Sequence, residues 1–251
     1  STDKIESKVA TTNNKFTKTF TDYGKYYIRA RGNFDSNWSE TIQINIVDIK
    51  NSLGLISWFK ADTNNVLITG INSVNIWNDA AVTTRTATQF NNSQMPALLK
   101  NIPSLNNNNV ISFNGDPFLP SRLYINETIT APNDFSLFTV QNFNTASTTN
   151  DIQYFLSGPV GGFWSEIKYL NGGFGLYGSN NTGIYSSASA LSFSYSMFNY
   201  SSTYIEKNKA SVPFVSLGGI ADARRMNITD IGTLNPYSLY AYKGEIAEMI
   251  F

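Results

Sequence analysis

The sequence predicts an all-β protein with antiparallel strands, and three observations support this fold class. Short runs rich in Ile, Val, Phe, Tyr and Thr are separated by clusters of Asn, Gly, Pro and Ser, which is typical of strands joined by turns. Beyond residue 53 the sequence shows neither a long amphipathic helix nor a heptad or tandem repeat. The 251 residues, 41% hydrophobic and 14% aromatic, can bury one sizeable core and a small additional module.

Two strands are expected in residues 1–49. Residues 25–31 (KYYIRAR) form the first run and residues 41–47 (TIQINIV) the second. In the second run isoleucine alternates with polar residues, which is the period of a strand in a sheet with one buried face. Residues 26–31 followed by residues 37–40 (NWSE) resemble the aromatic-Arg strand and the Trp-Ser turn of fibronectin type III modules.

This resemblance implies only part of a module. A fibronectin type III or Ig-like sandwich needs about seven strands over ~100 residues, whereas fewer than fifty residues precede the second domain. We therefore expect residues 1–49 to be the C-terminal part of an Ig-like or fibronectin III-like module whose earlier strands lie upstream. The alternative is a smaller β-appendage.

Residues 50–251 form the expected second domain, whose first residues overlap a short linker at residues 48–53. Its clearest strands are residues 55–59, 110–113, 134–143, 152–156, 174–177, 192–200 and 244–251. Weaker strand patterns cover residues 72–77, 200–206 and 213–217. Residues 220–226 are compatible with one turn of helix.

Four short motifs occur in order in this domain: residues 54–62 (GLISWFKAD), 77–79 (WND), 110–115 (VISFNG) and 244–251 (GEIAEMIF). In this order and spacing they resemble the laminin-G/concanavalin A-like jelly-roll family. The resemblance covers about four-fifths of the chain. It implies two stacked antiparallel sheets, so the expected architecture is a concanavalin A-like jelly-roll sandwich preceded by the partial Ig-like module.

The resemblance also implies roles for single positions. Trp58, Phe113 and Ile250 would fill the space between the two sheets, as large apolar residues do. Residues 134–140 (DFSLFTV) resemble the long central strand of the family, and alternate residues beginning at Phe135 would face one sheet surface.

One turn departs from the family pattern. Residues 205–208 (IEKN) occupy the place where the family often has a strand followed by Asn-Gly. Here Lys209 replaces the glycine.

Charge and composition exclude several classes of function. Lys+Arg and Asp+Glu are 18 each and the pI is about 6.3, so the chain lacks the basic excess that a nucleic-acid backbone requires. No apolar run approaches the ~20 residues of a membrane-spanning helix. The absence of Cys and His excludes thiolate nucleophiles, Ser-His-Asp relays and imidazole metal sites. We therefore expect neither a nucleic-acid partner nor a membrane span.

Carboxylate chemistry is the main catalytic alternative that composition leaves open. The glycosidase branches of the superfamily place two or three carboxylates on one face of a strand, in the pattern Glu-Xaa-Asp-Xaa-(Xaa)-Glu, which does not occur here. The nearest pair, Glu245 and Glu248, would lie on opposite faces of a regular strand unless a bulge intervenes. Glu166 stands alone beside Trp164. We expect the protein not to be an enzyme.

Calcium is a further possibility, because members of the resembling family often hold it with Asp and Asn oxygens at a loop rim. The candidate ligands are Asp62, Asp79, Asp116 and Asp151. Since no dense Asp-rich loop is present, capping or Asx turns explain single aspartates equally well. We expect no cofactor and no metal site, with a structural calcium ion as the open alternative.

The strongest binding signal is residues 158–178, where aromatic residues occur among glycines. Such rings offer flat apolar faces to sugar C–H groups while Asn and Tyr supply directional hydrogen bonds. The candidate ligand-binding residues are Trp164, Tyr169, Asn171, Tyr177 and Tyr185. The alternative is that these aromatics fill the sandwich or a subunit interface. Arg224 and Arg225 could clamp an anionic sugar, although a solvated pair is the simpler interpretation.

These observations favour a non-catalytic attachment module that binds a glycan or host-cell surface. Ig-like modules joined to such jelly rolls resemble adhesion parts of phage virions, which implies a head fibre, decoration protein or tail fibre. The alternatives are a purely structural capsid or oligomerisation module, including a homo-oligomer, and a secreted bacterial surface adhesin. A glycoside hydrolase is less favoured. The expected location is the virion, with virion proteins as partners, or the cell surface and extracellular space.

Overall fold

The computed structural model describes residues 23–29, 39–46, 48–49, 54–116, 118–131, 135–143, 152–158, 166–170, 173–177, 183–186, 195–201, 205–212, 214–217, 226–233 and 241–251. For residues 131, 152, 166–170, 173–177, 183–186, 200–201, 214–217 and 226 it describes the backbone alone. The chain divides into two compact units, Ser1–Ser52 and Leu53–Phe251.

The described part of the first unit is an antiparallel pair of strands, β1 (Gly24–Ile28) and β2 (Ile42–Ile46). Tyr26 lies opposite Ile44, and both side chains are partly buried. Ile42, in contrast, is 63% exposed. The two predicted strands are therefore present, while the assignment of this unit to an Ig-like or fibronectin III-like module stays a prediction.

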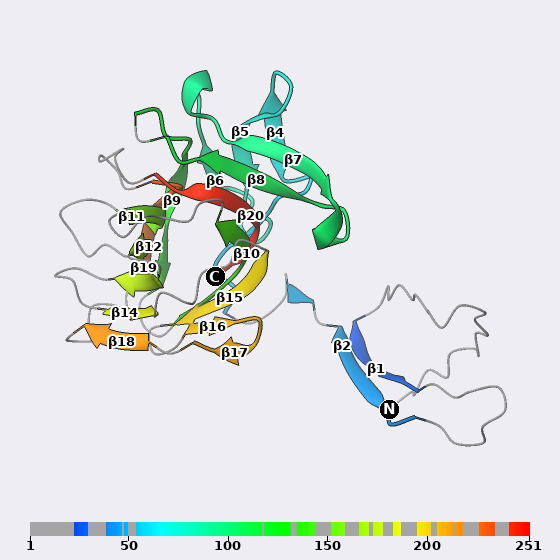
Figure 1. Ribbon diagram of the computed structural model, residues 1–251. Helices are drawn as coiled ribbons and strands as arrows, with labels where there is room; N and C mark the ends of the chain where they lie inside the picture. Colours follow the sequence, from blue (N-terminus) through cyan, green and yellow to red (C-terminus); the bar gives the residue numbers. More distant parts are fainter. Residues whose placement is uncertain are drawn as a thin grey trace. The chain divides into compact units, whose positions relative to one another are not determined.

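The second unit is an all-β antiparallel sandwich of the jelly-roll class that the sequence predicts. Its last strand, β20 (Lys243–Ile250), pairs on one side with β10 (Ser136–Phe143), from which the sheet continues through β15 (Ser196–Ser201), β16 (Ile205–Lys207) and β17 (Ala210–Ser211). On its other side β20 pairs with β3 (Trp58–Lys60) and β8 (Asn108–Asn114). In Figure 1 β20, drawn in red, lies between these two groups of strands.

From β8 the antiparallel pairing continues through a long series of strands. In order of pairing these are β7 (Ala97–Ile102), β5 (Ser73–Asn78), β6 (Thr86–Thr88), β9 (Leu123–Ala131), β19 (Met226–Ile231), β11 (Ile152–Ser157), β12 (Glu166–Leu170), β13 (Gly173–Tyr177), β14 (Gly183–Ser186) and β18 (Phe214–Leu217), with β4 (Val66–Thr69) paired to β5. The described residues of this unit include two single turns of 3₁₀ helix, η2 (Asn92–Gln94) and η3 (Pro103–Leu105).

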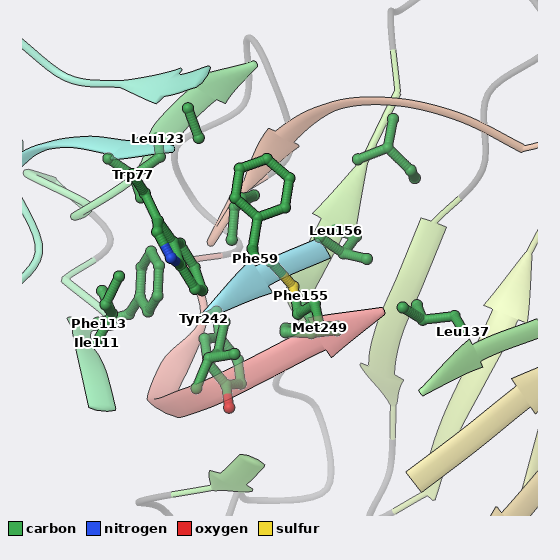
Figure 2. Close-up of a cluster of buried hydrophobic side chains, with 14 of the residues drawn as sticks. Phe59, Trp77, Ile111, Phe113, Leu123, Leu137, Phe155, Leu156, Tyr242 and Met249 are labelled. Carbon is green, nitrogen blue, oxygen red and sulfur yellow. The ribbon is translucent and has the colours of Figure 1, made fainter. Parts of the chain in front are cut away.

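Large side chains from both groups of strands converge in one core (Figure 2). Tyr242 is its centre: its ring lies 5.8 Å from Phe113, 5.6 Å from Phe143 and 5.5 Å from Phe155, centroid to centroid. Its hydroxyl donates to the backbone oxygen of Asn142 at 2.5 Å, so the buried polar atom is satisfied. Burying side chains of this size contributes about 1.5–3 kcal/mol each, which makes this cluster the main stabilising element.

The core confirms some of the expected packing roles and corrects others. Phe113 is buried as predicted, whereas Trp58 and Ile250 are partly exposed. Their neighbours Phe59 and Met249 fill the interior instead, with no exposed surface. The prediction that Trp58 and Ile250 face the interior was wrong. Phe59 pairs with Met249 and both face the core, and because successive strand residues point to opposite faces, their neighbours Trp58 and Ile250 face outward.

The central strand β10 agrees with its prediction. Phe135, Leu137 and Thr139 are buried, at 8%, 0% and 1% exposure. The intervening residues Phe138 and Val140 face outward and are more exposed. This alternation shows which face of β10 is free to meet other molecules.

The 77–79 motif has a structural role. The buried carboxylate of Asp79 accepts hydrogen bonds from Ser57 Oγ at 2.6 Å and from the Trp58 amide at 2.9 Å. Its other partners include the Ala81 amide at 2.8 Å and Arg85 Nη1 at 3.1 Å. Since a buried charge is tolerated when it is paired and hydrogen-bonded, this network joins the start of β3 to the loop after β5.

Candidate binding face

The outward side of β3, β20, β10, β15 and β16 forms a surface that we call the outer face. Its rows follow from strand register, because residues paired across antiparallel strands share a face. The first row is Trp58, Ile250, Phe138, Asn199 and Glu206. The second row is Lys60, Glu248, Val140 and Met197, and the third is Ser112, Glu245 and Asn142. The outer face therefore carries an apolar strip beside a row of hydrogen-bonding groups.

Two apolar residues of this face are notably accessible. Phe138 is 40% exposed and Met197 is 36% exposed, although both lie in the middle of paired strands. An exposed aromatic side chain on a rigid strand can stack against a ligand with little loss of conformational freedom. Phe138 is therefore the natural anchor of the outer face.

A β-bulge in β20 places two carboxylates on the outer face. Val140 pairs with Glu248, whereas the next residue of β10, Gln141, pairs with Ile246, so Ala247 is the additional residue. Asn142 and Val140 are two positions apart on β10, and the residues opposite them, Glu245 and Glu248, therefore share a face. The exception that the sequence analysis allowed for is the arrangement found.

A groove of about 370 Å³ opens at one margin of the outer face. Its lining comes from β3, β10, β20 and the loop between β7 and β8, and comprises Lys60, Ala61, Asp62, Ser104, Leu105, Asn106, Asn107, Asn108, Asn109, Val140, Ala247 and Glu248. Val140 and Ala247 supply apolar surface to this lining, and most of its other side chains are polar or charged. This lining offers hydrogen-bonding groups beside apolar surface.

The asparagines at the rim are held in place by backbone geometry. Asn106 and Asn107 have φ angles of 53° and 62°, in the left-handed region that Asn tolerates better than other non-glycine residues. Asn108 Nδ2 donates to the backbone oxygen of Leu105 at 2.8 Å. The exposed carboxamides of Asn106 and Asn107 make no hydrogen bond to another described residue, so they are available to a ligand.

Each charged group at the groove has a partner within the protein. Trp58 Nε1 donates to Glu248 Oε1 at 2.6 Å, and Lys60 Nζ lies 4.8 Å from the centre of the Trp58 ring. The same ammonium lies 3.2 Å from Asp62 Oδ2. These contacts orient Trp58 and Glu248, while the ion pair itself is exposed and contributes little to stability.

The second carboxylate of the bulge is held by neighbouring strands. Glu245 Oε2 accepts a hydrogen bond from Asn142 Nδ2 at 3.0 Å and one from the hydroxyl of Tyr195. Burial, together with the hydrogen bond to Glu245 and its charge, raises the pKa of Tyr195 above its ordinary value. Tyr195 therefore stays protonated and continues to donate to Glu245.

The residues that the sequence analysis singled out lie largely outside the described part of the chain. Trp164 and Asn171 are outside it altogether. Tyr169 belongs to β12, Tyr177 to β13 and Tyr185 to β14, with their side chains outside the described residues. Arg224 and Arg225 are also outside the described residues.

The outer face was missed in the sequence analysis. The available signal was Phe138, an apolar residue at a position where the alternation of β10 calls for a polar one. An exposed apolar residue is common on protein surfaces, so it indicates a site only once its cross-strand neighbours are known.

Three of the aspartates considered as calcium ligands, Asp62, Asp79 and Asp116, accept hydrogen bonds from backbone amides. Asp62 Oδ1 accepts from the amides of Asn64 at 3.1 Å and Asn65 at 3.0 Å. Asp116 Oδ1 accepts from the amide of Phe118 at 2.8 Å, among others, and these bonds lower the pKa of Asp116.

Asp79 is bonded to Arg85 as described above, and Asp151 lies outside the described residues. In the part of the chain that the structure covers, no three acidic side chains come together as a cation site. Turn capping thus accounts for the bonds that Asp62 Oδ1 and Asp116 Oδ1 accept from backbone amides.

Among the described residues, no helix has the length and apolar character needed to cross a bilayer.

Comparisons with known proteins add little. No family model matches the sequence, and no curated protein is significantly similar to it. Among solved structures, the chain is similar to a Trypanosoma rangeli sialidase in complex with 2,3-difluorosialic acid, with a TM-score of 0.44 and 8% sequence identity. The alignment covers 80% of this chain but 30% of the sialidase chain. This likeness is too weak to support an inference about function.

Proposed function

We propose that the protein is a non-catalytic attachment module that binds a glycan along the outer face. The observation that carries this proposal is the row in which Trp58, Ile250 and Phe138 lie side by side across three paired strands. A sugar ring presents C–H groups on its faces and hydroxyls at its edge. It therefore fits an apolar strip that has hydrogen-bonding groups alongside it.

The groove supplies the polar part of such a site. The free carboxamides of Asn106 and Asn107 can donate to and accept from sugar hydroxyls. Glu248 has one oxygen beyond the bond to Trp58 and can accept from another hydroxyl. A residue of a glycan seated in the groove would thus be oriented by polar contacts, while the next residue reaches the apolar strip.

The setting of this activity is proposed from the sequence resemblance. A jelly roll joined to an Ig-like module resembles adhesion parts of phage head fibres, decoration proteins and tail fibres, and of secreted bacterial surface proteins. A virion location, with host-cell glycans as the ligand, agrees with the Cys-free composition.

A glycoside hydrolase is the second candidate, and the bulge at Ala247 is the observation that favours it. Hydrolysis needs two carboxyl groups on one face, about 5–10 Å apart, with one of them free to protonate a leaving oxygen. Here Glu245 is held by Asn142 and Tyr195, and Glu248 by Trp58. These contacts support a positioning role for both carboxylates, so we rank attachment first.

The test begins with a glycan array, followed by titration of the best hit by calorimetry. The Phe138→Ala variant should weaken binding by about tenfold, since stacking on an aromatic ring contributes about 1–1.5 kcal/mol. Phe118→Ala is the matched control, because Phe118 is 84% exposed and belongs to none of the rows that form the outer face. Equal binding by wild-type protein and Phe138→Ala would refute the site, and the absence of any array hit would refute the function.

Two further variants separate the alternatives. If Trp164→Ala or Tyr177→Ala abolishes binding while Phe138→Ala does not, the site lies in the segment that the sequence analysis favoured. If the wild-type protein shortens the bound glycan and Glu248→Gln stops this cleavage, the protein is a hydrolase. Under the attachment proposal the glycan is recovered intact from both proteins.

A further inference from the structure

The charged side chains of the groove differ in sign and in number. Glu248 lies directly opposite Lys60 across β20 and β3, and Asp62 follows at the turn after β3. These are the three charged residues of the groove lining. One ammonium and two carboxylates leave the groove with a formal charge of −1, in a chain whose formal net charge is +0.

The positive charge of Lys60 is offset within the protein. Its Nζ lies 3.2 Å from Asp62 Oδ2, so an anionic group that approaches this ammonium meets the carboxylate of Asp62 as well. Lys243 of β20 is five positions from Glu248, which is about 14–17 Å along a strand and beyond the ~10 Å over which 0.1 M salt screens a charge. The groove lining includes none of the other lysines on the neighbouring strands and turns, which are Lys100, Lys207, Lys209 and Lys243.

The carboxylate of Glu248 is held by a neutral group. Its Oε1 accepts from Trp58 Nε1 at 2.6 Å, and an indole N–H orients a carboxylate without cancelling its charge. The second oxygen of an ionised carboxylate can only accept hydrogen bonds. A sugar hydroxyl can donate to it, whereas the carboxylate or sulfate of an acidic sugar has no proton to donate and is repelled.

The rows of the outer face beside the groove have the same sign of charge. Their charged residues are Lys60, Glu206, Glu245 and Glu248, so carboxylates outnumber ammonium groups three to one. Glu206 Oε2 accepts from the carboxamide of Asn199 at 3.0 Å, another neutral partner. A glycan that lies across these rows therefore meets mainly negative groups next to the apolar strip.

Resting on the proposed function, we propose that the groove accepts uncharged, hydroxyl-rich sugar residues and excludes acidic ones. Glu248 determines this specificity, because it accepts from a sugar hydroxyl and repels a sugar carboxylate. The carboxamides of Asn106 and Asn107 can both donate and accept, so they fit an uncharged sugar without selecting a charge. The groove thus favours the opposite class of ligand from the anionic sugar considered for Arg224 and Arg225.

The test compares one oligosaccharide with its own oxidised form. The probes are the neutral oligosaccharide that binds best on the glycan array and the same compound after its primary hydroxyls are oxidised to carboxylates. Both are titrated by calorimetry into the 251-residue chain, in buffers of about 20 mM and about 0.5 M salt. At low salt the neutral form should bind at least about tenfold more tightly. The ratio of the two dissociation constants should shrink at high salt, because salt screens the repulsion.

Two variants identify the groups responsible. Glu248→Gln removes the charge and keeps an oxygen for the Trp58 bond, so the ratio should fall about fivefold, the effect of one unit charge at about 4 Å in water. Asp62→Asn keeps an oxygen for the turn and releases Lys60, so it should lower the ratio too. Glu127→Gln is the matched control, because Glu127 is exposed on β9 and belongs neither to the rows nor to the groove lining. It should leave the ratio unchanged, and the unfolding midpoint in urea should report that each variant is folded.

Equal or tighter binding of the oxidised form by the wild-type chain overturns this specificity, while the proposed function stands because a glycan is still bound. Strongest array hits among sialylated, uronic or sulfated glycans overturn it in the same way. A ratio that is equal at both salt concentrations, or that Glu248→Gln and Asp62→Asn change no more than Glu127→Gln does, shows that the lost hydroxyls and not the charge are responsible, and also overturns it. A chain that binds no glycan overturns the proposed function and this specificity together.

Discussion

Replacing the buried aspartate of β19 should make the protein more stable at neutral pH. Asp230 is 1% exposed and lies opposite Tyr124 on β9 and Ser157 on β11. Its Oδ2 accepts from Thr229 Oγ1 at 2.7 Å, whereas the buried Oδ1 has no partner among the described residues. Burial raises the pKa of Asp230 to about 6, against the opposing effects of the Thr229 hydrogen bond and the Arg122 charge.

The magnitude follows from the change in pKa. The ordinary value is 3.8, so the folded state holds the proton of Asp230 more tightly than the unfolded state by about two pH units. At about 1.4 kcal/mol for each unit, this is a free energy of about 3 kcal/mol. Because the folded pKa is raised, this contribution is fully present below pH 3.8 and is lost as the pH rises through about 6.

Asp230→Asn removes the charge and keeps the size of the side chain. We expect the variant to be more stable than the wild type at pH 7.5, by up to about 3 kcal/mol, and nearly equal to it at pH 4. The measurement is urea unfolding followed by tryptophan emission at pH 4, 5, 6 and 7.5, and the quantity compared is the difference between the two proteins at each pH. Asp116→Asn is the control, and its stability relative to the wild type should change with pH in the opposite direction, because hydrogen bonds from the Phe118 and Leu119 amides lower the pKa of Asp116. A difference for Asp230→Asn that does not change with pH, or a loss of stability at pH 7.5, would show that Arg122 compensates the charge and that the reasoning is wrong.

Two further predictions concern backbone geometry. A Cβ at Gly244 would clash with the backbone oxygen of Asn142 and with the Tyr242 ring. Gly244→Ala should therefore lower the free energy of unfolding, measured in urea, by about 1–3 kcal/mol. An unchanged midpoint of urea unfolding would mean that β10 and β20 separate easily. Asn208 and Lys209 form the turn between β16 and β17, with φ angles of 52° and 69°. Lys209→Gly should therefore stabilise the protein by about 1 kcal/mol, which a higher thermal midpoint would show. Asn208→Gly should give no such gain, because it also removes the bond that Asn208 Oδ1 accepts from the Met197 amide at 2.9 Å.

The fold class was predictable because its signals are local. The apolar and β-branched residues of 134–143 identified the strand that the structure shows as β10, and the family resemblance placed Phe135 and Leu137 on one sheet surface, which the structure buries. Strands with a weaker local signal were missed, such as β7 (Ala97–Ile102) and β9 (Leu123–Ala131). In these strands pairing with neighbours distant in sequence supplies the stability that the local pattern lacks.

The site illustrates what sequence patterns do not contain. Trp58 and Phe59 are adjacent aromatic residues, and composition does not say which of them enters the core. The bulge at Ala247 has no distinctive local sequence, yet it decides that Glu245 and Glu248 share a face.

The sequence by itself therefore determined the class of the fold, the absence of thiolate and imidazole chemistry, and the position of strands with strong alternation. The tertiary structure decided which face of each strand is outward and which residues meet across β3, β20 and β10. The physical reason is that strand periodicity is set within a few residues, whereas register and bulges are set by distant partners, such as Trp58 and Glu248, which bond although they are 190 positions apart.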